Sequence, residues 1–292
     1  MKKLFNLKRI MLIFLIVIVA LALLYHKNIV RLYTAITLYD QDKIANNFVT
    51  MYQSFNATVI PASTQPFQFP VDAKILPASF ASGDSQISTQ GFIKASQTSG
   101  LLVLKHGKIV YENYWLGQDS SKQHISFSMA KSFVSALMGI AIEDGFISSI
   151  DASVSDYVPE LMGSGYQDVS IKNVLQMSSG VRFNEDYGDF NSDINRFSRA
   201  TAFGTSLDKF TASLKGERAA GTYHHYVSID TQVLGMVLTR ATGKSLTHYL
   251  SEKIWQPLGM EHPAFWLADD NGMELALGGL NVTLRDYAKL GW

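Results

Sequence analysis

The sequence contains no cysteine and no excess of either charge. Without cysteine among its 292 residues, it has no disulfide, thiol nucleophile, thiolate metal site or lipid-modified cysteine. Because 25 basic residues balance 25 acidic ones, there is no basic excess to neutralise phosphates, and we expect no nucleic-acid partner. Apolar residues make up 47% of the chain and charged residues 17%, so a sizeable packed core is expected.

The first segment of the chain, residues 1–28, has the composition of a membrane-targeting sequence. Lys2, Lys3, Lys8 and Arg9 come before an uncharged apolar run that extends to Tyr25. This pattern indicates an uncleaved signal anchor or a cleaved signal peptide, and the one-sided charges argue against a buried core helix. Since positive charge stays inside, we expect an inner-membrane anchor with the domain facing the periplasm, or a protein secreted to the periplasm after cleavage.

Residues 29–86 are predicted to connect this segment to a folded domain. The part up to about Phe55 mixes polar and apolar residues and is expected to form a helical stalk. Residues 61–85 contain four prolines and many small polar residues, which indicates an extended linker that wraps onto the domain. The folded domain is then expected over residues 87–292.

The expected domain combines strands and helices. Two strand-like segments, 100–105 and 108–115, flank His106-Gly107, which fits a two-residue hairpin turn. Apolar spacing predicts helices over 128–145 and 231–242. One hairpin followed by a large helical region predicts an α/β protein of the α+β type, with an antiparallel sheet rather than alternating βαβ units.

Ser128 and Lys131 stand at the start of the first of these helices. Residues three apart lie on one helix face, so the hydroxyl and the amine are expected side by side. The apolar residues around them predict a site with little water, where desolvation lowers the pKa of lysine and prepares it as a base for serine. The backbone N–H of Ser128, in the first helical turn, is a candidate donor to an oxyanion.

The serine–lysine spacing is weak evidence by itself. On the order of one such match is expected by chance in a chain of this length, and Ser206 with Lys209 repeats the spacing. This second pair lies in a polar stretch and is interpreted as part of a solvated helix face. The apolar surroundings of Ser128 therefore distinguish it as the candidate nucleophile.

Several longer blocks carry more information. They are, in chain order, FSMAKSFVSALMGIAIEDGF, IKNVLQMSSGV, AGTYHHYVSIDTQVLGMVLTRATGKSL and ELALGGLNVTLRDYAKLG. In this order they resemble successive blocks of the serine β-lactamase and penicillin-binding-protein superfamily, in particular its class-C-like hydrolase and esterase branch. Within the branch, the sequence looks most like the 6-aminohexanoate-dimer hydrolases, and the resemblance extends from about Ser99 to the end of the chain.

The resemblance implies a β-lactamase/transpeptidase-like fold and a third catalytic group. In this superfamily a tyrosine in a Y-x-N or Y-x-S motif lies beside the serine and the lysine, and here that position is Tyr226. Its family role is to shuttle the proton from the serine to the leaving group, while Lys131 lowers its pKa. Groups in such contact titrate as a unit. Substrate contacts are expected from three further residues: Ser228, Tyr187 and His225.

Two features depart from the family pattern. Ser228 replaces the asparagine usual in related β-lactamases, which weakens the case for β-lactam turnover. The family's last strands, which carry a K-T-G or H-x-G-like motif, have no counterpart before Trp292, so the C-terminal strands of the domain are expected to be absent. The sequence is therefore expected to be a fragment or a truncated copy of a longer protein.

The expected function is hydrolysis of an amide or ester bond in a small-molecule substrate, through an acyl-enzyme on Ser128. Neither a metal nor an organic cofactor is expected; adjacent His224 and His225 point apart and have no carboxylate at ligand spacing. Two alternatives remain open: a β-lactamase or penicillin-binding D,D-peptidase, and a catalytically silent membrane-tethered binding protein. The sequence gives no oligomeric state.

Overall fold

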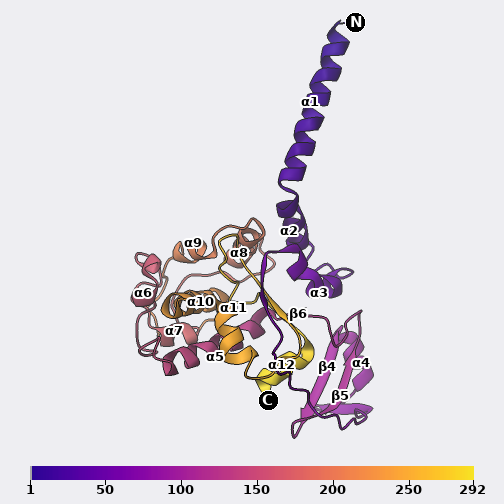
Figure 1. Cartoon of the computed structure of the whole chain (residues 1–292), viewed down its shortest axis with the longest axis vertical. Helices are drawn as coiled ribbons and strands as arrows, with labels where there is room; N and C mark the ends of the chain where they lie inside the picture. The colour runs from indigo at the N-terminus through magenta and orange to yellow at the C-terminus, as the bar shows by residue number, and fades with distance from the viewer. Residues whose placement is uncertain (1) are drawn as a thin grey trace.

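The computed structural model describes residues 2–292 and their side chains from Lys8 onward. The side chains of Lys2 and Lys3, part of the predicted basic region, lie outside the described residues. Helices and antiparallel strands occur together, as predicted for an α+β protein. Figure 1 shows the helical layer on one side, strands on the other, and a single helix projecting from the N-terminal end.

The central sheet has four antiparallel strands in the order β1-β7-β8-β6. The inner strands β7 and β8 are buried along most of their length, because the sheet is covered by other elements on both faces. The four strands are β1 (Ala57–Ile60), β6 (His124–Ile125), β7 (Ala264–Leu267) and β8 (Leu280–Val282). Two separate hairpins are β2 (Ser79–Ser82) with β3 (Ser85–Ser88) and β4 (Gly100–Lys105) with β5 (Lys108–Tyr114).

The helical layer is centred on two contacting helices, α5 (Ala130–Glu143) and α10 (Ser228–Thr242). The sequence predicted one apolar face for α10, but the helix is buried on all sides, since every residue from Ser228 to Leu238 is buried. The surrounding helices are α6 (Val154–Tyr157), α7 (Ile171–Leu175), α8 (Asp193–Ala202), α9 (Leu207–Ala212), α11 (Leu246–Leu250), α12 (Leu284–Gly291) and the short turns η1 (Phe127–Met129), η2 (Pro159–Leu161) and η3 (Ser251–Trp255).

Serine side chains start several of these helices by accepting a backbone N–H. Ser206 is one of them, because its hydroxyl accepts from the N–H of Lys209 at the start of α9. The second serine–lysine pair is thus a helix cap with an exposed lysine, which agrees with the interpretation of a solvated face. The other serine caps are Ser88, Ser153, Ser170, Ser192 and Ser245.

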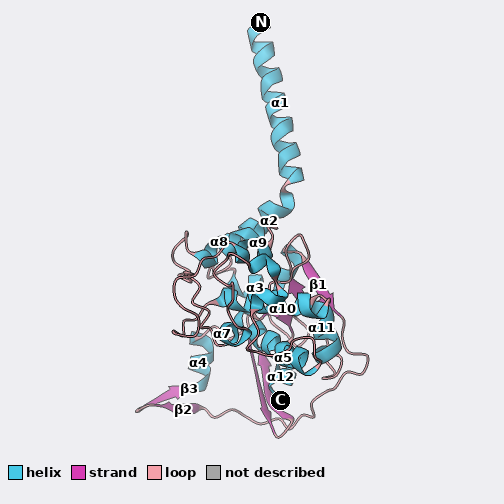
Figure 2. Ribbon diagram, turned by 90° about the vertical axis from the view of Figure 1, so that its left-hand side faces the viewer, coloured by secondary structure: helices cyan, strands magenta, loops and turns pink. Residues whose placement is uncertain are grey.

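The β4–β5 hairpin confirms the predicted two-residue turn. His106 and Gly107 both have positive φ, 52° and 70°, as a turn that follows the right-handed twist of its strands requires. Helix α12 packs against β4 and connects this hairpin with the central sheet. The β2–β3 hairpin, with α4 (Thr89–Ala95), projects from the rest of the molecule (Figure 2).

The N-terminal segment forms three helices, α1 (Lys2–Leu24), α2 (His26–Ile36) and α3 (Ile44–Ser54). The side chains of α1 from residue 10 to residue 24 are exposed, and the helix extends away from the domain (Figure 1). Within the described part of the chain, no single helix is long and apolar enough to cross a membrane. The stretch Lys8–Leu24 passes that test only together with α2, which is bent from it by 68°.

The predicted stalk and linker pack more closely with the domain than expected. Strand β1 pairs along its length with β7, from Ala57 opposite Leu267 to Ile60 opposite Ala264. Residues after β1 wrap as an extended chain, with the Ser63 N–H donating to the Met260 carbonyl at 2.9 Å. Residues before position 87 therefore contribute an edge strand to the central sheet, a pairing that its four-residue length conceals in the sequence.

Candidate active site

Ser128 lies in the short turn η1, directly before α5. Phe127 beside it has a φ of 42°, a left-handed conformation that is uncommon for a residue with a bulky side chain. The backbone of Phe127 is held against Gly278, where an added Cβ would lie 3.3 Å from the Phe127 backbone. Gly278 thus marks a close backbone approach, which fixes the position of Ser128.

Three predicted residues meet at this point. The Lys131 Nζ is 3.1 Å from the Ser128 Oγ, and the Tyr226 hydroxyl donates to the same Oγ at 2.9 Å. Tyr226 is 98 positions from Ser128 in the chain, so the fold alone brings them together. The Lys131 Nζ also lies 5.5 Å from the centre of the Tyr226 ring. The hydroxyl, the amine and the phenol are therefore in mutual contact.

Lys131 is held on its inner side by a backbone group. Its amine donates to the carbonyl of Leu277 at 2.7 Å. Desolvation by burial lowers the pKa of Lys131, and this outweighs the opposing effects of Tyr226 and of Glu185, which favour the charged amine. The predicted direction of the pKa shift and its predicted cause are both present.

The predicted dryness holds on one side of the site only. The inner face of α5 is completely buried at Phe133, Val134 and Leu137. On the other side Ser128 is exposed, and Met129 and Tyr226 are 50% and 46% exposed. Phe133, Val134 and Leu137 share one face of the helix, because residues three or four apart lie on the same side. Ser128 lies before the helix, in the turn η1, and is not part of this buried face. The hydroxyl is therefore open to solvent.

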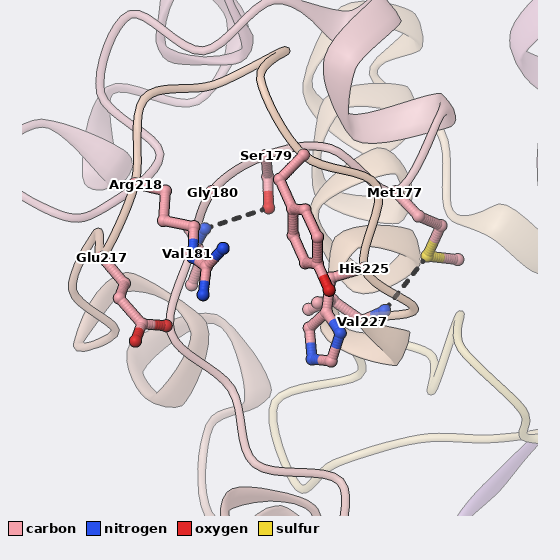
Figure 3. A pocket seen from close by; sticks show the side chains of 9 residues that line it. Met177, Ser179, Gly180, Val181, Glu217, Arg218, His225 and Val227 are labelled. Atoms are coloured by element: carbon pink, nitrogen blue, oxygen red, sulfur yellow. Dashed lines mark hydrogen bonds between the residues drawn. The ribbon is translucent and has the colours of Figure 1, made fainter.

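The loop after α7 positions Tyr226 through its neighbours. The Met177 carbonyl accepts from the His225 N–H at 2.9 Å, and the Met177 sulfur accepts from the Val227 N–H at 3.4 Å. Figure 3 shows the second contact, beside Ser179, whose hydroxyl accepts from the Val181 N–H. Met177 thus holds the backbone on both sides of Tyr226, and these two contacts orient the phenol.

A buried carboxyl group anchors the same loop to α10. Asp230 is completely buried and accepts from the hydroxyls of Tyr166 and Ser179, at 2.7 and 2.8 Å. Burial raises the pKa of Asp230 to about 7. Since Ser179 is two residues after Met177, this cluster supports the contact that holds Tyr226.

Ser228 does not have the substrate-binding position predicted for it. The side chain is 2% exposed and donates to Glu185 at 2.5 Å, while the Ser228 N–H donates to the second oxygen of the same carboxylate at 2.8 Å. A carboxylate at the first residue of a helix satisfies N–H groups that have no partner within the helix. Ser228 therefore fixes the start of α10 and the Glu185 loop, and does not face the site.

Glu185 is the residue that sequence reasoning missed. It lies in a polar loop with other carboxylates, and no spacing in the sequence distinguishes it from Asp186 or Asp189. Its carboxylate favours the charged form of Lys131 and also the neutral form of Tyr187. Glu185 thus has two roles: it accepts hydrogen bonds at the start of α10, and its negative charge acts on Lys131.

The other two predicted contacts lie in different cavities. Tyr187 lines a cavity of about 420 Å³ that also includes Phe127, and partial burial beside Glu185 raises the pKa of Tyr187 to about 12. His225 is exposed and lines a smaller cavity of about 130 Å³ with Arg218 (Figure 3). Both residues border the region around Tyr226 and Ser128, but on separate surfaces.

Comparisons with known proteins identify the family of this chain. Residues 90–291 match the protein family described as Beta-lactamase. The match covers more than half of the chain, so the chain belongs to the beta-lactamase family, and the resemblance noted in the sequence is confirmed.

Individual relatives support the same assignment. The 6-aminohexanoate-dimer hydrolase of Paenarthrobacter ureafaciens is 32% identical over 201 residues, which are 66% of this chain and 51% of the relative. The solved structure of a Bacillus anthracis protein, provisionally named a 6-aminohexanoate-dimer hydrolase, has a TM-score of 0.79 at 22% identity and covers 87% of this chain and 69% of its own. A class C beta-lactamase has a TM-score of 0.51 at 23% identity, over 68% of this chain and 60% of its own.

These structures confirm the predicted β-lactamase/transpeptidase-like fold. The chain spans about half the length of these curated relatives, the Paenarthrobacter hydrolase and an Escherichia coli protein.

Proposed function

We propose that this protein is a serine hydrolase that cleaves amide or ester bonds through an acyl-enzyme on Ser128. The contact of the Ser128 hydroxyl with both Lys131 and Tyr226 is the observation that carries the proposal. A serine hydroxyl is a weak nucleophile unless a neighbouring base accepts its proton. Here two candidate bases lie within hydrogen-bond distance, and one of them is desolvated.

The arrangement supports a two-step acyl transfer. In the first step the Ser128 Oγ bonds to the substrate carbonyl carbon, and its proton passes through the Tyr226–Lys131 pair to the leaving alcohol or amine as the ester or amide bond breaks. In the second step water attacks the carbonyl carbon of the acyl-serine and gives its proton to the same pair, which returns a proton to the Ser128 Oγ as the bond between this oxygen and the acyl group breaks and the acid leaves. The Ser128 N–H lies at the N-terminal end of the helical segment, where backbone N–H groups have no partner within the helix. It is a donor to the oxyanion in both steps.

The name of the Paenarthrobacter relative favours a linear amide as the substrate class. A penicillin-binding peptidase is a second candidate, because an Escherichia coli relative, 24% identical over 213 residues, has a name of the D-alanyl-D-alanine carboxypeptidase class. Ser228 stands where related β-lactamases have asparagine, and its hydroxyl donates to Glu185. This replacement favours the linear amide over the peptidase substrate.

Turnover of p-nitrophenyl acetate and of a linear aminohexanoate dimer tests the proposal. We expect Ser128→Ala to reduce kcat/KM by about a thousandfold or more, while Ser206→Ala, at the matched helix cap, leaves it within about twofold. Persistent labelling of Ser128 by a fluorescent penicillin, without turnover of esters or amides, would favour the peptidase class. Equal activity of Ser128→Ala and the unchanged protein would exclude a Ser128 acyl-enzyme.

We also propose that α1 anchors the protein to the inner membrane with the domain on the periplasmic side. Its exposed apolar side chains, preceded by Lys8 and Arg9, support this proposal. A cleaved signal peptide remains the alternative, and the two are distinguished by the N-terminal residue of the mature protein.

A further inference from the structure

An apolar cavity of about 420 Å³, which Tyr187 lines, lies beside the site. Its walls come from two parts of the chain that are distant in sequence, the N-terminal helices and α8, which contact each other. Figure 1 shows α8 beside α2. Most of the lining is apolar and includes Leu38, Met51, Phe55, Ile194, Phe197 and Leu275.

This cavity adjoins the candidate nucleophile. Phe127, the residue before Ser128, forms part of the wall. Leu277 and Gly278 form another part, and the Leu277 carbonyl is the group that accepts from Lys131. The same short segments therefore border both the serine–lysine pair and the apolar space, so the cavity lies beside any chain attached to Ser128.

The polar side chains of the α8 wall are already occupied within the protein. The Asn195 amide donates to the carbonyls of Tyr187 and Asp189, at 3.1 and 2.8 Å. Arg199 donates to the Phe190 carbonyl at 2.7 Å, and its guanidinium lies over the Phe190 ring. The Ser198 and Thr201 hydroxyls donate to carbonyls one turn earlier in the helix. Such a wall offers a ligand apolar contact and few free hydrogen-bond donors.

We propose that this cavity binds the unbranched alkyl chain on the acyl side of the substrate, so that the protein prefers medium-chain acyl esters or amides. The inference rests on the proposed function. The acyl group stays bonded to Ser128 through both steps of the reaction, whereas the alcohol or amine leaves after the first. A cavity that adjoins the serine and has a mostly apolar wall stabilises the acyl chain throughout, because each methylene placed in it leaves water.

A chain-length series of p-nitrophenyl esters from acetate to decanoate tests this preference. We expect kcat/KM to rise up to about fourfold for each added methylene, until the cavity is filled. Ala35→Phe, from the N-terminal wall, and Ser198→Phe, from α8, reduce the space. Both variants are expected to lower kcat/KM for decanoate by about tenfold or more, and to leave acetate within about twofold.

Ser213→Phe is the matched control for Ser198→Phe. Ser213 is exposed, lies outside this cavity and, like Ser198, donates to a carbonyl one turn earlier. We expect this control to keep the chain-length preference of the unchanged protein. A flat series while acetate is hydrolysed, or a preference for long alcohols such as decyl acetate over long acyl chains, would overturn the inference and leave the proposed function intact.

Direct binding separates the two proposals if no ester is hydrolysed. Sodium decanoate is titrated calorimetrically into the Ser128→Ala protein, which needs no catalysis. Binding that Ser198→Phe weakens by about tenfold or more, and that Ser213→Phe does not change, would support the cavity assignment even where the hydrolase proposal fails. Decanoate that does not bind the Ser128→Ala protein would contradict the cavity assignment.

Discussion

Lys131 combines a buried stem with an amine in contact with two hydroxyl groups. Because desolvation lowers its pKa, the neutral amine that serves as a base is available at lower pH than for an exposed lysine. Lys131→Arg keeps the charge but provides no base near neutral pH. We expect kcat/KM to fall by about 10²-fold or more, whereas Lys209→Arg at the second serine–lysine pair has no effect.

The pH dependence of the unchanged protein tests the same group. We expect kcat/KM to rise with pH through an apparent pKa below that of an exposed lysine, and this apparent value belongs to the coupled groups rather than to Lys131 alone. Tyr226→Phe removes the phenol that donates to Ser128 and is expected to lower kcat/KM by about 10²-fold. Full activity of Tyr226→Phe would assign proton transfer to Lys131 alone.

Asp230 predicts a specific pH dependence of stability. Burial raises its pKa to about 7, so the folded protein holds this proton more tightly than the unfolded chain, where the pKa is about 4. The resulting stabilisation is fully present below about pH 4 and is lost as the pH rises through about 7.

Asp230→Asn removes this titration. Between about pH 4 and pH 8, the unchanged protein is expected to lose on the order of 4 kcal/mol of unfolding free energy relative to the variant. Urea unfolding across this range measures the difference. Asp84→Asn, at an exposed turn, serves as the control. Parallel pH profiles for Asp230→Asn and the unchanged protein would show that Asp230 titrates alike in both states.

At the scale of elements, the start of α10 depends on the contact between Ser228 and Glu185. Ser228→Ala removes the hydroxyl and leaves a carboxylate oxygen without that donor. We expect the unfolding free energy to fall by about 1 to 3 kcal/mol. Ser213→Ala, at an exposed position, is expected to change it by less than about 0.5 kcal/mol. Equal small effects in both variants would mean that water replaces the lost donor.

Local elements could be predicted from the sequence and the central sheet could not. The His106-Gly107 turn and helix α10 depend on neighbouring residues, and both were predicted. Strands β6 and β8 have only two and three residues, too few for a periodic pattern. Strand β1 was assigned to a stalk and linker because its pairing with β7 depends on residues some 200 positions away.

The site divides in the same way. Ser128 and Lys131 are predicted by their spacing together with the apolar residues around them, whereas Tyr226 required the family resemblance, since nothing local connects it with position 128. The Leu277 carbonyl that holds Lys131 is a backbone group, which any residue provides, so no sequence pattern indicates it. Ser228 was assigned to the substrate because its partner Glu185 has no distinguishing feature in the sequence.

At the scale of the whole molecule, α1 extends away from the folded domain, and its apolar side chains from Ile10 to Leu24 are exposed. We expect the full chain to sediment with membranes and to resist extraction by alkaline carbonate. A variant that begins at residue 29 is expected to remain in the supernatant with its ester hydrolysis unchanged. Recovery of the full chain in the supernatant, with its N-terminus intact, would contradict the anchor.

The central claim is that the Ser128 hydroxyl is activated by Lys131 and Tyr226. The most direct measurement is the site of covalent modification after reaction with a fluorophosphonate, located by peptide mass spectrometry. The account predicts one adduct, on Ser128, that forms much more slowly in Lys131→Arg. Modification of another serine, or an adduct on Ser128 that forms equally fast in Lys131→Arg, would contradict it.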